Sequence, residues 1–503
     1  MTTTPLATDQ VPPTPDAPDA TDAPDRLPRR AWAGLAVLLT AMILNILDST
    51  IVNVAAPTIA GELSMTPSAL EWVAAAYTLA LAVGIMAGAR LGDVVGRRRM
   101  LVLGLVGFAA TSLLCSVAWD GPSLVVARAL QGLSAAVMVP QTFGLIRDLF
   151  PPRHLGKAFA AFGPVIGLST VLGPVVAGLL LEADLFGSSW RSLFWLNLPL
   201  CAVALLAAGR VLPEGAPRRH GLRLDWGGTL LLGTASFLLV FPLVDGRALG
   251  WPAWIVGVLV ASLPVLGLFV VHQRRRSRAG RTTLVEASVL GKRSYVSGVA
   301  FTQFFFGSVV GISLTLGLFL QLGLGFGPMR ASLYLAALAV GAFVGSGVGA
   351  WAATAVGRPI LHLGLTLMMA GCGVLWLSLH ALVASDPVGV ARLAPGLFVF
   401  GLGMGMIFVP LFSIIMGEID DREVGSASGL LESVQQLGAS LGVAVLGTLF
   451  FHRFALEEAG PVAAVRAGRH LEALEVTLLA TVGFLAVAWC LGWLLPRRAR
   501  AEH

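Results

Sequence analysis

Three ionisable side chains, Asp48, Arg128 and Glu432, lie inside long apolar stretches of the chain. A charge in the hydrocarbon core of a bilayer is costly and needs a partner, and a carboxylic acid there can bind and release a proton. At 1.5 Å per residue, Asp48 lies about 24 Å along its predicted helix, and Arg128 lies near the start of a helix that enters from the other side. The two side chains therefore fall at similar depth, and we expect that they can meet.

A second group of chemically distinctive residues occupies a short loop between two apolar stretches, from Ala89 to Arg99. It contains Asp93, Gly96 and three consecutive arginines that begin with Arg97. Gly96 permits a tight turn, and Asp93 can accept hydrogen bonds from a helix N-terminus. Arginines in such a loop are also expected simply for membrane topology, but topology does not require Asp93 or Gly96.

The elements that must position these residues are membrane helices. The chain has 503 residues, of which 56% are hydrophobic and only 12% charged, whereas soluble domains carry about 25% charged residues. Because a helix needs about 20 apolar residues to cross a bilayer, the hydropathy pattern predicts an all-α polytopic membrane protein. Its fourteen spans are 32–52, 70–90, 100–119, 122–148, 158–182, 193–212, 226–246, 252–272, 295–322, 330–351, 359–382, 393–416, 425–451 and 474–495.

The distribution of basic residues predicts the orientation. With a cytoplasmic N-terminus, 26 of the 34 lysines and arginines fall on the inner side, 7 fall on the outer side, and Arg128 lies within a span. This bias follows the positive-inside rule and places both termini in the cytoplasm. Asp48 and Arg128 then lie in the outer half of the membrane.

The two halves of the chain repeat weakly. Gly96-Arg97 follows the second span and Gly357-Arg358 follows the tenth, while Val139-Pro140 and Val409-Pro410 lie in the fourth and twelfth. Internal repeats are typical of secondary transporters. The predicted organisation is a disordered cytoplasmic tail (1–30), a six-helix bundle (31–212), two linker helices with cytoplasmic loops (213–294), a second six-helix bundle (295–496) and a short cytoplasmic tail (497–503).

Several chemistries lack a motif in the sequence. Gly156-Lys157 has neither the glycine spacing nor the preceding strand of a nucleotide-binding loop. There is no His/Cys metal cluster and no nucleophile motif, so we predict neither an enzyme nor a cofactor. The net charge of +6 comes from loop arginines, so a nucleic-acid partner is not expected.

These motifs resemble those of the fourteen-helix drug:proton antiporters of the major facilitator superfamily, from about residue 32 to residue 495. The similar segments are Leu47–Ala55 around Asp48, the Asp93/Gly96/Arg97 loop, Arg128 with Gln131 and Gly132, Gly163-Pro164, Gly167, Gly173-Pro174, Gly178, Trp190-Arg191 and Asn197-Leu198-Pro199. The chain departs from the family pattern at Ala89, where the motif opens with glycine, at His272–Arg276, where an acid is usual, and at Glu432.

The resemblance implies a major facilitator fold and a role for each motif. Asp48, Arg128 and Glu432 become candidates for proton coupling. Asp93, Gly96 and Arg97 become a conformational latch that stabilises the outward-facing state. Gly163, Pro164, Gly173, Pro174 and Gly178 become a bending helix that seals against proton leak, for which close helix packing alone is the alternative.

Two of the coupling candidates have structural alternatives. Proton binding to Asp48 and release of Arg128 would alternate with substrate loading; otherwise they form a permanent pair, or the arginine binds carbonyls and only fixes helix packing. Glu432, about 10 Å deep from the inner side, binds protons or a cationic substrate, or is an interfacial glutamate hydrogen-bonded to neighbours such as Gln435 and Gln436.

Polar side chains seldom face lipid, so some of them are candidates for lining a substrate cavity together with apolar residues, although packing is the alternative for each apolar one. The cavity candidates are Tyr77, Gln131, Gln303, Gln321, Phe304 and Met404.

We therefore expect a monomeric exporter of small amphipathic drugs, antibiotics or secondary metabolites, driven by the proton gradient across a bacterial cytoplasmic membrane. Its partners are the substrate, protons and the lipid bilayer. A proton-coupled uptake carrier for a nutrient is the main alternative, and a membrane sensor or enzyme without transport is the third.

Overall fold

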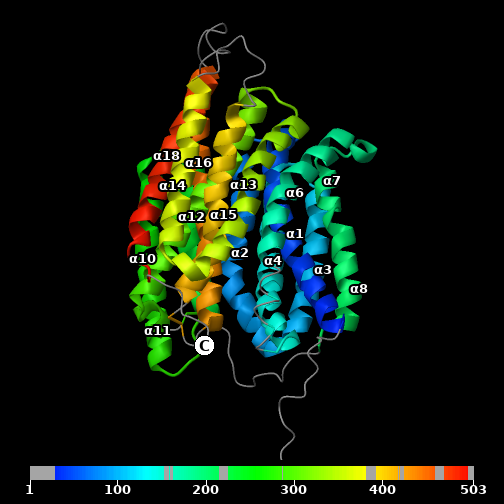
Figure 1. Cartoon of the computed structure of the whole chain (residues 1–503), viewed down its shortest axis with the longest axis vertical. Helices are drawn as coiled ribbons and strands as arrows, with labels where there is room; N and C mark the ends of the chain where they lie inside the picture. The colour runs from blue at the N-terminus through cyan, green and yellow to red at the C-terminus, as the bar shows by residue number, and fades with distance from the viewer. Residues whose placement is uncertain are drawn as a thin grey trace, which may run out of the picture.

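The computed structural model describes residues 29–151, 154, 158, 162–213, 225–285, 287–380, 392–416, 418–419, 424–458 and 469–496. Of the predicted tails, 1–30 and 497–503, residues 1–28 and 497–503 lie outside this range, whereas Arg29 and Arg30 belong to the first helix. Within it, thirteen helices are long and apolar enough to cross a membrane. The one predicted span not among them is the fifth, 158–182, which corresponds to α6 (Phe162–Ala183) and has a shorter apolar segment, Gly173–Ala183. The all-helical polytopic fold predicted from the sequence is confirmed (Figure 1).

The first half of the chain forms one group of helices, which we call the first bundle. Its elements are α1 (Arg29–Glu62), α2 (Pro67–Val95), α3 (Arg97–Ser116), α4 (Gly121–Leu149), α6 (Phe162–Ala183), the short η1 (Leu185–Gly187), α7 (Arg191–Trp195) and α8 (Asn197–Val211). The predicted sixth span is divided into α7 and α8 because Pro199 has no N–H to donate to Trp195, four residues earlier.

The second half forms the second bundle. Its elements are α12 (Arg293–Leu318), the π-helical turn η2 (Phe319–Gly323), α13 (Pro328–Val356), α14 (Pro359–His380), α15 (Leu393–Met416), α16 (Val424–Glu458) and α18 (Arg469–Gly492). Between the bundles in sequence come α9 (Trp226–Asp245), α10 (Ala253–Arg278) and the short α11 (Ala287–Gly291).

Local sequence explains where key helices begin and end. The Thr66 hydroxyl accepts a hydrogen bond from the Ala69 N–H, and Pro67 occupies the first position of α2. Asp120 caps α4 reciprocally with Ser123, and these hydrogen bonds hold the pKa of Asp120 below its usual value. Between α2 and α3, Gly96 adopts φ of +111°, a conformation that L side chains rarely adopt.

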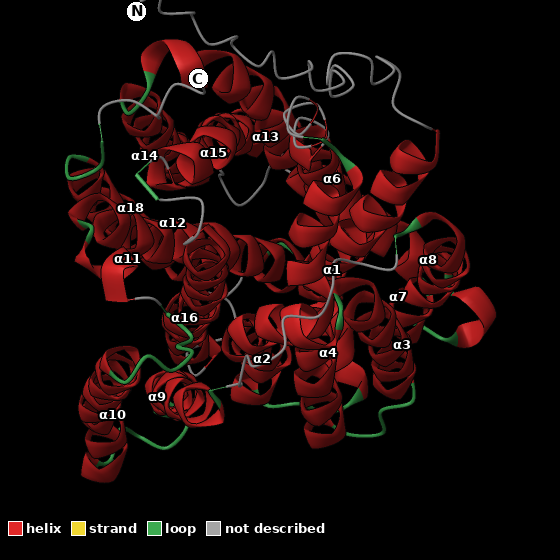
Figure 2. Cartoon of the chain, turned by 90° about the horizontal axis from the view of Figure 1, so that it is seen from below, coloured by secondary structure: helices red, strands yellow, loops and turns green. Residues whose placement is uncertain are grey.

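The two bundles pack their helices in the same pattern. In the first, α2 and α3 pack on α4 while α1 packs on α6; in the second, α13 and α14 pack on α15 while α12 packs on α16. The bundles meet along α2 with α16 and along α6 with α13, two contacts that the repeat makes equivalent (Figure 2). The sequence repeat is therefore reflected in three dimensions.

The helices α9 and α10 form a hairpin beside the two bundles (Figure 2). In it, α9 packs against α2 and α16, whereas α10 packs mainly against α9 and also touches α11. We call the end of the molecule at which α1 begins and α18 ends the termini side, and the opposite end the far side. Arg30 at the start of α1 and Val211 at the end of α8 are hydrogen-bonded on the termini side.

Candidate functional site

The structure places Arg128 of α4 directly against Asp48 of α1. The Arg128 guanidinium donates a hydrogen bond to Asp48 Oδ2, and its Nε donates to the Val73 carbonyl of α2 at 3.2 Å. Both charged side chains are fully buried, with exposures of 0% for Asp48 and 1% for Arg128. The expected meeting of the two charges is observed, while their role in proton coupling stays a prediction.

The other carboxylate oxygen, Asp48 Oδ1, accepts hydrogen bonds from two amides. Gln131 Nε2 of α4 and Asn197 Nδ2 of α8 each donate to it at 2.9 Å. The same amides also reach the Ser112 hydroxyl of α3, at 2.8 and 3.1 Å, and Gln131 Oε1 accepts from Arg128 at 2.7 Å. Asp48 thus joins α1, α4 and α8 through a polar network inside the first bundle.

Tyr77 completes the surroundings of the arginine. Its ring lies 4.3 Å from the Arg128 guanidinium carbon, a cation–π contact, and its hydroxyl donates to Asn45 Oδ1 at 2.7 Å. Tyr77 and Gln131 were predicted to line a cavity. In this conformation both are buried inside the network, so a cavity-lining role stays a prediction for another state.

The chemistry of this network follows from its burial. A buried ion pair must recover the cost of desolvation through good geometry and additional hydrogen bonds, and here the carboxylate has three donors. A proton bound to Asp48 would remove its charge and weaken each of these contacts. Proton binding would therefore loosen α1 from α4 and α8 within one bundle.

Asn197 and Ser112 were not predicted as site residues, and neither was Asn45, which accepts from Tyr77. Asn197 was noted only as part of the sixth-helix motif, and Ser112 gave no signal because a serine in an apolar helix usually bonds its own backbone. Asn197 Oδ1 is buried without a hydrogen-bond partner within the described part of the chain. The network therefore contains one unsatisfied acceptor.

The latch candidates lie together on the termini side. Arg97 donates to Asp93 at 3.2 Å, to Asp148 of α4 at 3.2 Å and to the Gly144 carbonyl at 3.2 Å. Asp148 was not predicted, because it lies 51 residues from its partner in sequence. These contacts fix the loop to the first bundle, and the role of the three residues as a latch stays a prediction.

The departure from the motif at Ala89 has a structural counterpart. A Cβ on Gly88 would lie 2.1 Å from the Ala136 carbonyl oxygen of α4. The close approach of α2 to α4 therefore depends on Gly88, while Ala89 is only half-buried. The shifted glycine still allows the two backbones to touch.

Glu432 lies in α16, close to the contact with α2. Gln436 Nε2 donates to its carboxylate at 3.4 Å, and the adjacent Ser433 donates to the Ala82 carbonyl of α2. No basic side chain within the described ranges forms an ion pair with Glu432. The structure thus shows the predicted glutamine contact and leaves proton or cation binding as a prediction.

The helix α6 lies between α1 and the second bundle. A Cβ on Gly173 would lie 2.1 Å from the Thr50 hydroxyl of α1, and one on Gly178 would lie 2.7 Å from the Ser332 hydroxyl of α13. Pro174 lies inside the helix. Gly163 and Pro164 also fall within α6, although their surroundings lie outside the described residues. Close packing is therefore observed, and the sealing role stays a prediction.

The remaining cavity candidates lie in the second bundle. Gln321 Nε2 donates to the Val54 carbonyl of α1 at 2.8 Å, across the two bundles. The Gln303 amide lies 3.1 Å from the Val434 carbonyl, the Phe304 ring lies edge-on to Phe484, and Met404 is buried. In this conformation these four side chains fill contacts between helices.

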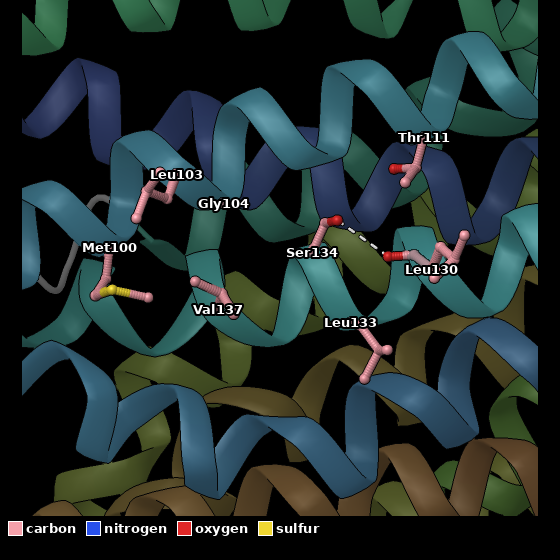
Figure 3. Close-up of a pocket in the computed structure, with 8 residues that line it drawn as sticks. All are labelled: Met100, Leu103, Gly104, Thr111, Leu130, Leu133, Ser134 and Val137. Carbon is pink, nitrogen blue, oxygen red and sulfur yellow. Dashed lines mark hydrogen bonds between the residues drawn. The ribbon is translucent and has the colours of Figure 1, made fainter.

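A shallow groove of about 370 Å³ lies between α3 and α4 (Figure 3). It is lined mainly by apolar side chains, and the Ser134 hydroxyl on its wall donates to the Leu130 carbonyl of its own helix. Leu103, Leu130 and Leu133 on its rim are exposed on the outside of the bundle. This groove therefore faces lipid and lies outside the polar network.

Taken together, two similarly packed helix bundles and a charged pair buried within one of them define a polytopic membrane protein with the architecture of a secondary transporter. The chain belongs to the Major Facilitator Superfamily, whose family model matches residues 38–443.

Curated relatives and solved structures agree with this assignment. The chain is 46% identical over 426 residues to a probable actinorhodin transporter of Streptomyces coelicolor, covering 84% of this chain and 73% of the relative. It is 32% identical to the puromycin resistance protein pur8 of Streptomyces alboniger, with 93% and 92% covered. A bacterial homologue of the human drug peptide transporters PepT1 and PepT2 has a TM-score of 0.61 at 16% identity, covering 92% and 97%, which supports the fold alone.

Proposed function

We propose that this protein is a proton-coupled antiporter that exports amphipathic antibiotics, drugs or secondary metabolites by alternating access. The single observation that carries the proposal is the fully buried Asp48–Arg128 pair with its amide donors. An intramembrane carboxylate is a natural proton site. Support for the cargo comes from relatives described as transporters or resistance proteins for actinorhodin, puromycin and tetracenomycin C.

In this proposal the two bundles are the moving units. They touch along α2 with α16 and along α6 with α13, so rocking about these contacts would open one side and close the other. Proton binding to Asp48 would weaken its hydrogen bonds and so favour one arrangement of α1. The termini side would face the cytoplasm, as the bias of basic residues indicates, and the protein would act as a monomer in a bacterial cytoplasmic membrane.

The latch and the remaining candidates act within this cycle. Arg97, Asp93 and Asp148 would stabilise the closed termini side, and Gly173 and Gly178 would let α6 slide against α1 and α13. Glu432 would be a second proton or cation site on the face of α16 toward α2. Gln303, Gln321, Phe304 and Met404 would line the cavity when the bundles part.

The test is transport by the full chain in an efflux-deficient bacterial host and in inverted membrane vesicles. We expect resistance to at least one of actinorhodin, puromycin and tetracenomycin C, and uptake into inverted vesicles that an imposed proton gradient drives. Asp48→Asn should abolish the gradient-driven component while the protein still reaches the membrane. Full proton-driven uptake by this variant would exclude Asp48 as the coupling site, and solute accumulation by whole cells would favour the uptake carrier.

A further inference from the structure

Glu71 of α2 is another buried carboxylate, and it lies on the far side of the molecule. It comes four residues after the start of α2 at Pro67, its side chain is 1% exposed, and its Oε1 has no hydrogen-bond partner among the described residues. A buried charged oxygen without a partner is costly, so the group needs an explanation.

Glu71 lies where the first bundle, the second bundle and the hairpin meet. From α16, the Thr448 hydroxyl lies 3.4 Å from Glu71 Oε2 and donates more closely, at 2.8 Å, to the Leu243 carbonyl of α9. A Cβ on Gly447 would lie 3.1 Å from the Glu71 carboxyl carbon. The contact between α2 and α16 therefore closes directly over the carboxyl group.

The charged neighbours of Glu71 come from the end of the hairpin. The charged groups that act on it electrostatically are Asp245, the last residue of α9, and Arg247, just after that helix. From the described part of α16, the neutral Thr448 hydroxyl donates to Glu71. Asp245 accepts a hydrogen bond from the Trp72 indole at 2.7 Å. Arg247 Nε is buried without a hydrogen-bond partner within the described ranges. The charged side chains of α1 and α4 on this half of the molecule have partners of their own, Glu62 with Arg191 and Asp48 with Arg128.

We propose that Glu71 is a further proton-binding site, distinct from Asp48 and Glu432, which takes up a proton from the far side when α2 and α16 close together there. The inference rests on the proposed antiport. In the closed arrangement Gly447 and Thr448 cover the carboxyl group and exclude water, and this loss of solvation favours the neutral acid. When the helices part, water and Arg247 can stabilise the carboxylate. Only an O–H bond forms or breaks, and closing the far side becomes linked to proton uptake.

This linkage has the direction that an exporter needs. If the far side faces outward, a proton enters from outside as the outer opening closes, and the carrier then turns inward in its protonated form. High external pH would hold the far side open, and low external pH would close it. Glu71 would thus set the external pH dependence of the conformational change.

The experiment measures the opening of the far side without any substrate. Spin labels at Gly61→Cys and Gly327→Cys report the distance between the bundles on that side; both glycines are exposed and have open space around them. The background carries Cys490→Ser, because the other three cysteines are buried. The full chain is reconstituted in lipid nanodiscs, and the distance distribution is recorded from acidic to alkaline pH.

We expect the long-distance population to rise with pH in the otherwise unchanged chain. Glu71→Gln, which is nearly isosteric and permanently neutral, should keep the short distance at every pH. Arg247→Gln removes the cation that favours the carboxylate, so the midpoint should move to higher pH. Glu182→Gln, at an exposed carboxylate near the far-side end of α6, serves as the control and should open with the parental midpoint.

A Glu71→Gln variant that opens with the same midpoint as the parent would overturn the proposal, as would a parent chain with no pH response. Thermal unfolding of each variant checks that the fold is intact. Thr448→Val removes a hydrogen-bond donor to the carboxylate and should move the midpoint to higher pH, and a shift to lower pH would contradict the proposal. Failure of the proposed function would look different. A chain that shows this pH response but no proton-driven export would refute the antiporter, while Glu71 would still control the opening of the far side.

Discussion

At the scale of single residues, Asn197 shows how the buried pair is held. Its amide donates to both Asp48 and Ser112, and so connects α8 to α1 and α3. We expect Asn197→Ala to lower the free energy of unfolding by about 1.5–3 kcal/mol, the usual loss for a hydrogen bond to a charged group. Thermal or denaturant unfolding in detergent measures the change.

Ser308→Ala is the matched control for that substitution. The Ser308 hydroxyl is equally buried but bonds only to the Phe304 carbonyl of its own helix, so its removal should have a much smaller effect. Equal losses in the two variants would mean that Asn197 contributes packing alone.

Two substitutions in the proposed latch distinguish the contribution of the backbone conformation at Gly96 from that of the ion pair. Because Gly96 has φ of +111°, Gly96→Val should lose about 1–3 kcal/mol of stability through backbone strain. Asp148→Asn removes a partly exposed ion pair, which is worth about 0.2–1 kcal/mol. The free energies of unfolding of the two variants test whether Gly96→Val is the more destabilising. A larger loss in Asp148→Asn would contradict this expectation.

At the scale of elements, the contact of α2 with α4 depends on one small residue. A methyl group on Gly88 would clash with the Ala136 carbonyl, so Gly88→Ala should cost about 1–3 kcal/mol or force the helices apart. Gly347→Ala in α13 is the control, since open space surrounds Gly347, and it should be neutral or slightly stabilising. Melting temperatures of the purified variants distinguish the two.

The duplicated arginine shows how the two halves have diverged. Arg97 donates to Asp93 of α2 and to Asp148 and the Gly144 carbonyl of α4. Arg358, in the equivalent turn, donates to the Trp493 and Leu495 carbonyls after α18. In the first half that kind of contact is made by Arg98, which donates to Gly209 in α8. The second turn thus connects helices rather than holding an acidic cluster.

The helices could be predicted because hydropathy can be read from the sequence. The pairing of Asp48 with Arg128 could be predicted because the helical rise gives the depth of each residue and a buried charge needs a partner. Ser112, Asp148 and Glu71 could not, since their roles depend on partners that only tertiary packing brings near. Glu71 illustrates this best: it lies close to a helix start, where a glutamate is ordinarily solvated, and only the approach of α16 and α9 buries it.

At the scale of the whole molecule, the hairpin is held at both membrane faces. On the termini side Asp225 caps α9 through the Gly228 N–H at 2.9 Å and accepts from His272 and Gln273 of α10, each at 2.8 Å. Gln273 also accepts from the Leu284 N–H at 3.0 Å. The hairpin is thereby fixed to the loop that leads into the second bundle.

This cluster predicts a loss of stability in acid. Burial alone would raise the pKa of Asp225, but hydrogen bonds from His272, Gly228 and Gln273 outweigh it and hold the pKa below its usual value. A lowered pKa in the folded state stabilises the protein above the unfolded value, about 4. That contribution is lost as the pH falls through the folded pKa.

Unfolding measured between neutral pH and about pH 3 should therefore show a steeper acid decline in the parent than in Asp225→Asn. Parallel pH profiles of the two proteins would show that Asp225 does not carry this dependence.

The position of α10 at the rim has a consequence for how this chain can change over evolutionary time. Because α10 packs mainly on α9, substitutions along its length disturb little else and can accumulate. The two ends of the hairpin are different, because each interacts through a pair of residues. One pair is Asp225 with His272 and the other is Glu71 with Arg247, and the loss of either member removes the interaction. Across related sequences, the rim helix should drift freely while these two pairs change together or not at all.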